Sequence, residues 1–386
     1  KFRRMDKEFN EFFRLLENNE KKSRREVENY QWCKIKDMVN LAYNNTQFYR
    51  DKYDKAGFEP SQLKSIRDIN KIPILNKNEI RGQEIKLLLS KYKGKIVKLH
   101  TSGTTGTPLE FYCNKKAISR ENAAIAYQWK RIGYNFLDGK IELRGYVNNS
   151  EKDFIYIPNE KILRINILTM SEKNIDRILT KISILGYRFI LGYPSAVYKF
   201  ASILENCNKI IEIEGIMLAS EVIYDWQLEK IDKIFPTSKK IAHYGQAERV
   251  ALGAWYDKRE YYFIPSYGYL EFDKSNNNFI ATGFINEIMP LIRYRLTDSC
   301  EIINLSEESE EKMLFPIVKN IIGRQEDFTY NIKGELIPPA VVTFPFKDLR
   351  RIKACKIIQH TLSHFELFLE GVDNNLTSDE KNGLII

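Results

Sequence analysis

The most informative part of the chain reads LHTSGTTGTPL, beginning at Leu99 and ending at Leu109. Two glycines and five hydroxyl side chains stand within it, directly after a strand-like run at residues 95–99. Glycines let the backbone curl so that several N–H groups converge, and hydroxyls add further donors. This combination suits the oxygens of a polyphosphate. A Walker A loop is excluded because no Gly-Lys-Ser/Thr follows. An ordinary Ser/Thr/Gly-rich surface loop is the alternative interpretation.

Around this loop, strand-like and helix-like segments alternate from residue 96 to about residue 322. Residues 188–192 predict a short buried strand, and Pro194 then opens a helix whose apolar side chains share one face. Residues 269–272 and 279–282 flank a turn rich in Asn and Ser, which is typical of a β-hairpin. The alternation of strands and helices predicts an α/β protein built of layered β-sheets and helices.

The 386 residues are enough for two or three domains, and the texture of the sequence changes twice. Residues 1–80 are predicted to form a helical N-terminal region, and residues 81–323 a core that carries the loop. Residues 324–386 are predicted to form a hinge and a partial C-terminal domain. Roughly 60 residues are few for an independent hydrophobic core.

The composition excludes several classes of protein. The 60 Lys and Arg residues against 51 Asp and Glu give a net charge of +9, but the excess is spread along the chain without an arginine-rich block. Nucleic-acid binding therefore rests on net charge alone and is not expected. No apolar run approaches the roughly 18–20 residues that cross a bilayer, and no signal peptide is visible, so we expect a soluble, cytoplasmic protein without a membrane span. The cysteines are scattered, without a C-x-x-C pair, which argues against a disulfide framework or a zinc site: Cys33, Cys113, Cys207, Cys300 and Cys355.

The LHTSGTTGTPL string resembles the phosphate-binding signature of the adenylate-forming superfamily, which includes acyl-CoA synthetases, luciferases and the adenylation domains of peptide synthetases. The resemblance implies that the loop holds the phosphates of ATP and that Thr104 takes part in catalysis. Many members carry a lysine where Thr107 or Leu109 falls, and this sequence has none. The loop residues with an implied nucleotide contact are Ser102, Gly103, Thr104, Thr105, Gly106 and Thr107.

A second string, KIAHYGQAE at residues 240–248, resembles the family's Tyr-Gly-x-Thr/Ser-Glu motif. In that motif the aromatic ring stacks on adenine, the hydroxyl contacts the α-phosphate, and the glutamate holds Mg²⁺. The resemblance implies nucleotide binding by Tyr244 and Gly245, and a catalytic, Mg²⁺-binding role for Glu248. Ala247 replaces the hydroxyl residue, so one phosphate hydrogen bond is missing or supplied elsewhere. Taken alone, Glu248 reads as a solvated carboxylate on a helix, and His243 either faces the substrate carboxylate or packs in the core.

A third string, MPLIRYRLTD at residues 289–298, is similar to the Pro-x-Ile-Arg-Tyr-Arg-x-x-Asp pattern of the phenylacetate–CoA ligase branch. The aspartate of that pattern binds both ribose hydroxyls, which implies this role for Asp298. A carboxylate accepts two hydrogen bonds from vicinal hydroxyls well, so the role is chemically sensible. Arg293 and Arg295 belong to the site or are structural ion-pair partners, and the sequence leaves both alternatives open.

Three further segments carry the same resemblance. Residues 323–327 resemble the motif that closes the large domain, which implies that Arg324 contacts ribose or phosphate and takes part in catalysis, with Glu326 at the hinge. Residues 192–195 and 219–222 look like the substrate-strand and adenine-edge segments of the branch, which implies nucleotide contacts for Ser220 and Glu221. Within the branch, the sequence resembles the CapK-type proteins of capsular polysaccharide biosynthesis.

The resemblance implies a large adenylate-forming N-terminal domain, with a small β-rich subdomain, followed by a small α+β C-terminal domain. The implied reaction is ATP-dependent adenylation of a small carboxylate, followed by transfer of the acyl group to a thiol or an amine, in capsule or surface polysaccharide biosynthesis. The implied cofactors are ATP or AMP and Mg²⁺, with CoA as one acyl acceptor.

The C-terminal domain is expected to be incomplete. The family carries there a Gly-Lys motif whose lysine bridges the substrate carboxylate and the α-phosphate. No match precedes Ile386, and Lys356 and Lys381 do not fit its context. A trimmed segment and a natural absence are both open. The alternative function is a non-catalytic nucleotide-binding or scaffold protein on the same fold. Ala247, in place of the hydroxyl residue, and the absence of a lysine from the loop favour this alternative.

Overall fold

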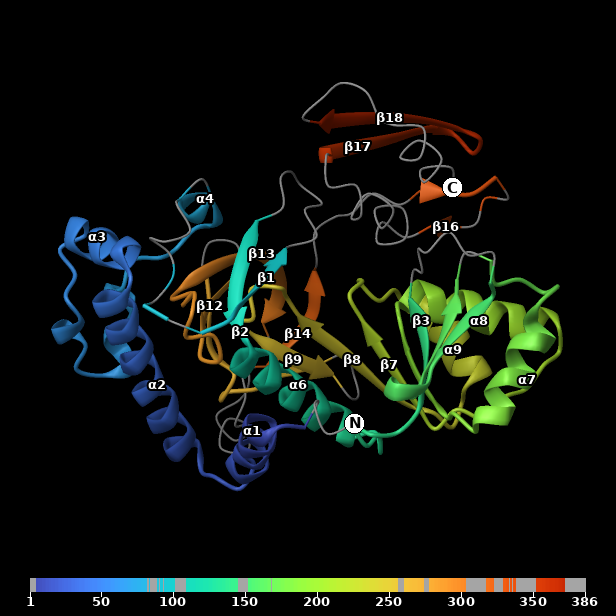
Figure 1. Cartoon of the computed structure of the whole chain (residues 1–386), viewed down its shortest axis with the longest axis horizontal. Coiled ribbons are helices and arrows are strands. Elements are labelled where there is room, and N and C mark those ends of the chain that lie inside the picture. Colours follow the sequence, from blue (N-terminus) through green and yellow to red (C-terminus); the bar gives the residue numbers. More distant parts are fainter. Residues whose placement is uncertain are drawn as a thin grey trace. The chain divides into compact units, whose positions relative to one another are not determined.

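The computed structural model forms two compact units (Figure 1), which we call the first unit and the second unit. The first unit comprises Lys1–Thr101, Leu109–Phe136 and Ile241–Arg324, and the second comprises Ser102–Pro108, Leu137–Lys240 and Gln325–Ile386. The division predicted from the sequence, at residues 80/81 and 323/324, stays a prediction. The structure describes residues 5–81, 83, 89, 91–92, 94–100, 109–144, 152–167, 169–255, 260–273, 278–302, 317–322, 329–332, 334, 336–337 and 352–371.

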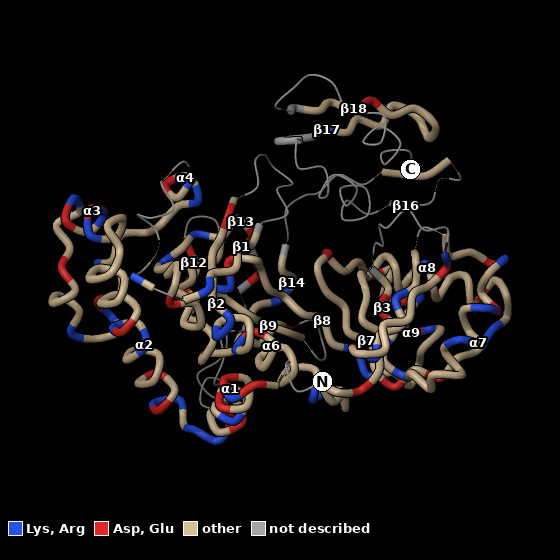
Figure 2. Tube along the Cα trace, in the orientation of Figure 1, with Lys and Arg blue, Asp and Glu red and all other residues tan. Residues whose placement is uncertain are grey.

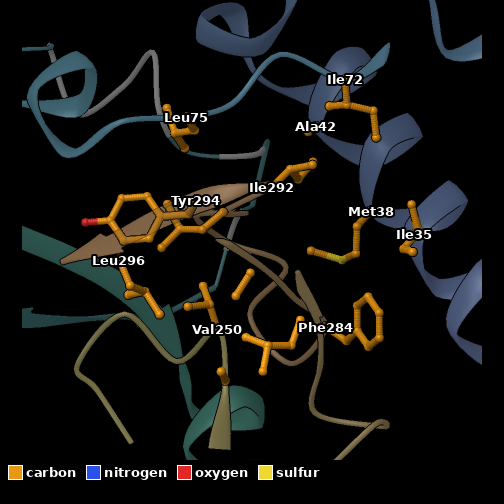
Figure 3. Packing of buried hydrophobic residues seen from close by; sticks show 14 of the residues in the cluster. Ile35, Met38, Ala42, Ile72, Leu75, Val250, Phe284, Ile292, Tyr294 and Leu296 are labelled. Carbon is orange, nitrogen blue, oxygen red and sulfur yellow. The ribbon is translucent and has the colours of Figure 1, made fainter. Parts of the chain in front are cut away.

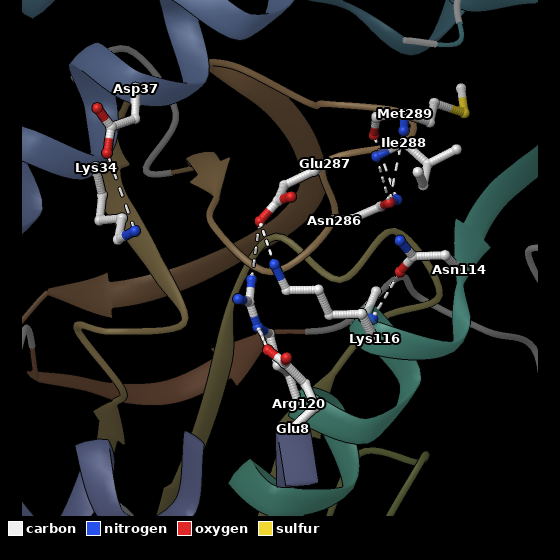
Figure 4. Close-up of polar contacts among 11 residues, drawn as sticks. Glu8, Lys34, Asp37, Asn114, Lys116, Arg120, Asn286, Glu287, Ile288 and Met289 are labelled. Atoms are coloured by element: carbon white, nitrogen blue, oxygen red, sulfur yellow. Dashed lines mark hydrogen bonds and ion pairs between the residues drawn. The ribbon is translucent and has the colours of Figure 1, made fainter. Parts of the chain in front are cut away.

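The helices of the first unit begin at well-defined caps. Ser23 and Glu26 form a capping box at the start of α2, and Thr46 accepts a hydrogen bond from the backbone N–H of Tyr49 at the start of α3. Glu8 of α1 forms an ion pair with Arg120 of α6, and the same guanidinium reaches Glu287 (Figure 4). The helices are α1 (Lys7–Asn19), α2 (Arg24–Asn45), α3 (Gln47–Lys55), α4 (Lys77–Ile80) and α6 (Lys115–Lys130), with 3-10 turns η1 (Pro60–Gln62) and η2 (Ile66–Lys71).

The strands of the first unit form antiparallel ladders. The two strands that flank residues 101–108 pair with each other, and the last pair before those residues is His100 with Glu110. The larger set runs in the order β11-β12-β13-β14-β10-β9-β8. Strand bounds are β1 (Ile96–His100), β2 (Glu110–Asn114), β8 (Lys239–Gly245), β9 (Leu252–Trp255), β10 (Glu260–Phe263), β11 (Gly268–Phe272), β12 (Asn278–Gly283), β13 (Tyr294–Ile302) and β14 (Ile317–Ile322).

A hydrophobic core joins these strands to α2 (Figure 3). Ile35, Met38 and Ala42 lie on one face of α2 and are at most 3% exposed. Tyr294 and Ile292 belong to the same cluster and are equally buried. Burial of each large apolar side chain contributes about 1.5–3 kcal/mol, so this cluster fixes β13 against the helical layer.

The second unit has a parallel sheet, with strand order β7-β6-β3-β5-β4 and only β4 antiparallel to its neighbour. The strands are β3 (Lys140–Arg144), β4 (Phe154–Ile157), β5 (Ile162–Asn166), β6 (Phe189–Gly192) and β7 (Gly215–Ala219). Helices α7 (Ile175–Leu185), α8 (Pro194–Asn206) and α9 (Asp225–Ile234) alternate with them, and η3 (Pro158–Glu160) is a 3-10 turn. Two further ladders are β15 (Thr329–Tyr330) with β16 (Leu336–Ile337), and β17 (Ile352–Thr361) with β18 (His364–Gly371).

The predicted α/β class is confirmed. Strand β6, the helix that opens at Pro194 and the β11–β12 hairpin all form where the sequence predicts them. Along the described parts of both units, Lys and Arg residues are interspersed with Asp and Glu residues (Figure 2). None of the helices within the described ranges is both long enough and apolar enough to cross a membrane.

Candidate functional site

A bulge in β13 carries the predicted ribose-binding carboxylate. Ile280 of β12 pairs with Arg295, and Asn278 pairs with Ser299, so β13 advances four residues while β12 advances two. Asp298 lies within this irregular stretch. A bulge interrupts the alternation of a strand and redirects its side chains, and bulges are common beside functional sites. The bulge therefore explains how Asp298 leaves the regular ladder.

Tyr244 and Asp298 meet directly. The Tyr244 hydroxyl donates a hydrogen bond of 2.9 Å to Oδ2 of Asp298. The Tyr244 ring lies at the end of β8 and packs against Phe263 and Phe279, with centroid distances of 5.8 and 5.5 Å. Burial and the neighbouring Asp298 carboxylate raise the pKa of Tyr244 well above its usual value, so its hydroxyl stays a donor. Two residues predicted from separate motifs are thus brought together.

Glu248 lies in a turn directly after β8. The backbone N–H of Arg249 donates to the carbonyl oxygen of Gln246 at 3.0 Å, which closes the turn. Glu248 is 8% exposed, and the Tyr294 hydroxyl donates to its Oε1 at 3.4 Å. The alternative of a solvated carboxylate on a helix is therefore wrong. Burial of a carboxylate is costly unless it is paired, which marks Glu248 as a candidate functional group.

The two arginines of the MPLIRYRLTD string are held by structural contacts. Arg293 forms a bidentate pair with Glu271, at 3.0 and 2.9 Å, and donates from Nη1 to the carbonyl oxygen of Ile72 at 2.6 Å. Arg295 pairs with Asp273 at 2.8 Å. Burial raises the pKa of Glu271, and the Arg293 guanidinium opposes that rise. Of the two open alternatives, the structure supports the ion-pair one.

His243 packs against helix α6. Its Nδ1 lies 3.0 Å from Oε1 of Gln128, whose side chain is fully buried. A Cβ atom placed on Gly245 would lie 3.1 Å from Nε2 of His243, so the glycine permits a close approach of the ring. These contacts support the packed interpretation of His243.

In the second unit, Ser220 and Glu221 follow the carboxyl end of β7. Ser220 has a φ of 71°, in the left-handed region that a residue with a Cβ rarely adopts. Oε2 of Glu221 accepts hydrogen bonds from the Ser195 hydroxyl at 2.7 Å and from its backbone N–H at 3.3 Å. Ser195 lies in the first turn of α8, after the parallel strand β6. The segments predicted at residues 192–195 and 219–222 are therefore joined at the edge where ligands bind in open α/β sheets.

The other predicted site residues lie outside the described residues: Ser102, Gly103, Thr104, Thr105, Gly106, Thr107, Arg324 and Glu326. Sequence reasoning missed Tyr294 as the partner of Glu248 and Ser195 as the partner of Glu221. Tyr294 and Ser195 both lie within the motifs given above. Their partners are 46 and 26 residues away, so no local sequence pattern indicates the pairings.

Comparison with known proteins agrees with this architecture, although no protein-family model matches the chain. The chain is 24% identical to protein CapK of Staphylococcus aureus over 306 residues, covering 76% of this chain and 67% of CapK. It is 23% identical to indoleacetate–lysine synthetase of Pseudomonas savastanoi over 288 residues, covering 72% and 69% of the two chains. The phenylacetate–coenzyme A ligase of Aromatoleum evansii matches at 35% identity over 94 residues, or 24% of this chain and 21% of that enzyme.

The fold also matches a solved structure of 2-hydroxyisobutyryl-CoA ligase in complex with 2-HIB-AMP and CoA. The TM-score is 0.60 at 18% identity, covering 90% of this chain and 78% of the ligase. The shared fold and the curated relatives define the class of protein. The relatives and the shared fold support the predicted adenylate-forming superfamily, and they support an adenylate-forming ligase as the class of enzyme.

Proposed function

We propose that the chain uses ATP to convert a small carboxylate into an acyl-adenylate and then passes the acyl group to a thiol or an amine. The observation that carries this proposal is the pair of contacts in the first unit, Tyr244 with Asp298 and Tyr294 with Glu248. These contacts involve the ring of Tyr244 from β8 and two carboxylates, that of Glu248 from the turn after β8 and that of Asp298 from β13. The Tyr244 ring can stack on the base of a nucleoside, and the Asp298 carboxylate can accept hydrogen bonds from the ribose hydroxyls. The Glu248 carboxylate suits the cation that is bound to the phosphates.

The first step forms one bond and breaks one. A carboxylate oxygen of the substrate attacks the α-phosphorus of ATP, the bond to the bridging oxygen breaks, and pyrophosphate leaves. The protein contributes mainly position and charge neutralisation to such a transfer. Asp298 accepts the ribose hydroxyls, the Tyr244 ring lies against adenine, and residues 102–107 hold the phosphate oxygens. In the second step a thiol sulfur or amine nitrogen attacks the acyl carbon, AMP leaves, and the acceptor loses a proton.

The residues present fit Mg²⁺. This ion usually keeps several waters and is held by one or two carboxylates together with substrate phosphates. Within the described ranges no group of three His, Cys, Asp or Glu side chains is arranged to hold a metal. These ranges therefore contain no site in which protein side chains alone surround the ion. The buried carboxylate of Glu248 matches the open type of site. Mg²⁺, when bound, offsets the negative charge of the phosphates.

The relatives suggest two acceptors and one setting. A coenzyme A ligase uses a thiol, and the name of indoleacetate–lysine synthetase places an amino acid as acceptor. Both remain in the proposal, as CoA and as an amine. The similarity to CapK supports a setting in capsule or surface polysaccharide biosynthesis.

The test is release of pyrophosphate from Mg·ATP across a panel of amino, aryl, fatty and hydroxy acids. We expect release with at least one acid and none without an acid, and the responsive acid names the substrate class. Titration of ATP binding by calorimetry runs in parallel. Binding without release for every acid contradicts the proposal and supports the non-catalytic alternative.

A further inference from the structure

The residue that follows Glu248 has an unfavourable backbone conformation. Arg249 has a φ of 55°, in the left-handed region where glycine is the usual residue. A residue with a long side chain persists there only when its surroundings hold it in place, and such strain clusters at functional sites. The side chain of Arg249 is therefore where a compensating interaction should be found.

Arg249 forms a buried ion pair. Its Nε lies 3.4 Å from Oε2 of Glu121 on α6, and the two side chains are only 14% and 15% exposed. The Tyr267 hydroxyl donates to the same carboxylate oxygen. Burial raises the pKa of Glu121, and the Arg249 guanidinium opposes that rise. The pair thus joins the turn at residues 246–249 to helix α6.

A second contact joins Arg249 to β2. Its Nη1 lies 3.0 Å from Sγ of Cys113, which is fully buried. Strand β2 is the strand that follows residues 101–108. Through one guanidinium, the turn that carries Glu248 is therefore fixed to the strand next to the predicted phosphate loop.

The backbone of the turn also packs closely against two glycines. Gly268 and Gly283 are paired across the β11–β12 ladder. A Cβ on Gly268 would lie 2.1 Å from the carbonyl oxygen of Val250, and one on Gly283 would lie 3.0 Å from that of Arg249. The glycine pair and the Arg249 contacts both hold the turn closely, so its freedom to shift is small.

We propose that Arg249, acting through its ion pair with Glu121, is a positioning residue that holds the Glu248 carboxylate for the metal-bound phosphates of ATP. This inference rests on the proposed role of Glu248. Arg249 touches neither substrate nor metal in this account. Removing it lets the turn move, and Glu248 then no longer meets the cation at the right place. Partners that orient a metal ligand in this way typically matter about 10–100-fold for metal affinity.

The test measures ATP binding by calorimetry, once with Mg²⁺ and once with EDTA, beside thermal unfolding. The variants are Arg249→Met, Glu121→Gln and the double variant. We expect Arg249→Met to weaken binding of Mg·ATP about tenfold and to leave metal-free ATP within about twofold, because Tyr244 and Asp298 still hold the nucleoside. Glu121→Gln, which keeps the shape of the side chain, should act in the same direction and serves if Arg249→Met fails to fold.

The double variant separates positioning from stability. Its unfolding temperature should recover relative to Arg249→Met, because no buried charge is left unpaired. The increase in ATP affinity that Mg²⁺ gives the unmodified chain should still be absent. Arg120→Met is the matched control, since it cuts an ion pair of the neighbouring α6 residue with Glu8 and should lower the unfolding temperature only. If Mg²⁺ raises the ATP affinity of the Arg249 and Glu121 variants as much as it raises that of the unmodified chain, the inference is overturned. No Mg²⁺ gain in the unmodified chain overturns the role of Glu248 and the inference with it.

Discussion

The two units hold their candidate nucleotide residues in different ways. In the first unit, Tyr244 and Asp298 come from strands that are far apart in sequence, and they are fixed by a hydrogen bond to each other. In the second unit, Glu221 follows the parallel strand β7 and is fixed by the start of the preceding helix, α8, through Ser195. The first arrangement depends on exact tertiary packing, whereas the second depends on the edge of a sheet. Substitutions should therefore cost more function in the first unit than in the second.

Asp298→Ala is expected to have the largest effect. The carboxylate would accept two hydrogen bonds from ribose, and hydrogen bonds to charged groups contribute about 1.5–3 kcal/mol each. We expect kcat/KM for ATP to fall at least about 100-fold in the pyrophosphate-release assay. The control is Asp273→Asn, which removes a carboxylate that pairs with Arg295 and should change this value by less than about twofold. Equal losses in both variants would mean that Asp298 acts through folding alone.

Tyr244→Phe should have an intermediate effect. It keeps the ring and removes the donor to Asp298, so about 1 kcal/mol, or roughly five- to tenfold in kcat/KM for ATP, should be lost. In an Asp298→Ala background the same change should cost nothing further, because the partner is gone. Tyr43→Phe removes a similar 2.9 Å hydrogen bond to Asp54 away from the site and should leave ATP kinetics unchanged. Additive losses in the double variant would show that the two residues act separately.

Ser195→Ala should weaken the second unit by a smaller amount. The Glu221 carboxylate keeps the backbone N–H of residue 195 as a donor, so we expect a loss of about 1 kcal/mol in the free energy of unfolding. Ser202→Ala is the matched control on the same helix, because that hydroxyl donates only to the carbonyl oxygen of Tyr198. Denaturant unfolding measures both. A loss for Ser195→Ala no greater than that for Ser202→Ala would contradict the contact's importance.

The smallest effect concerns acid stability. Ion pairs with Lys230 and Lys233 of α9 lower the pKa of Glu205 on α8 to about 2. Because the folded pKa lies below the ordinary value of 4.5, this contribution is present above about pH 4.5 and is lost as the pH falls toward 2. Glu205→Gln should lower the unfolding temperature slightly at pH 6 and by less at pH 2. If Glu205→Gln changes the unfolding temperature by the same amount at both pH values, the lowered pKa of Glu205 does not contribute to stability.

The sequence predicted the class of fold and the motif residues because these signals are local. The glycine and hydroxyl pattern of residues 99–109, the hairpin of β11 and β12 and the helix after Pro194 can each be read within about ten residues. The sequence left Arg293 and His243 undecided because their partners, Glu271 and Gln128, become neighbours only through tertiary packing. The same reason hid Tyr294, Ser195 and Arg249. A left-handed backbone at an arginine has no sequence signature at all.

The central claim is that the first unit positions ATP for attack by a carboxylate on the α-phosphorus. The most direct measurement uses an acid that releases pyrophosphate, labelled with oxygen-18 in its carboxylate, and determines by mass spectrometry where the label appears after transfer to the acceptor. We predict one labelled oxygen in AMP, and we expect Asp298→Ala to form this labelled AMP at least about 100-fold more slowly at low ATP concentration. Label in inorganic phosphate together with formation of ADP would show attack at the γ-phosphorus and would contradict the account.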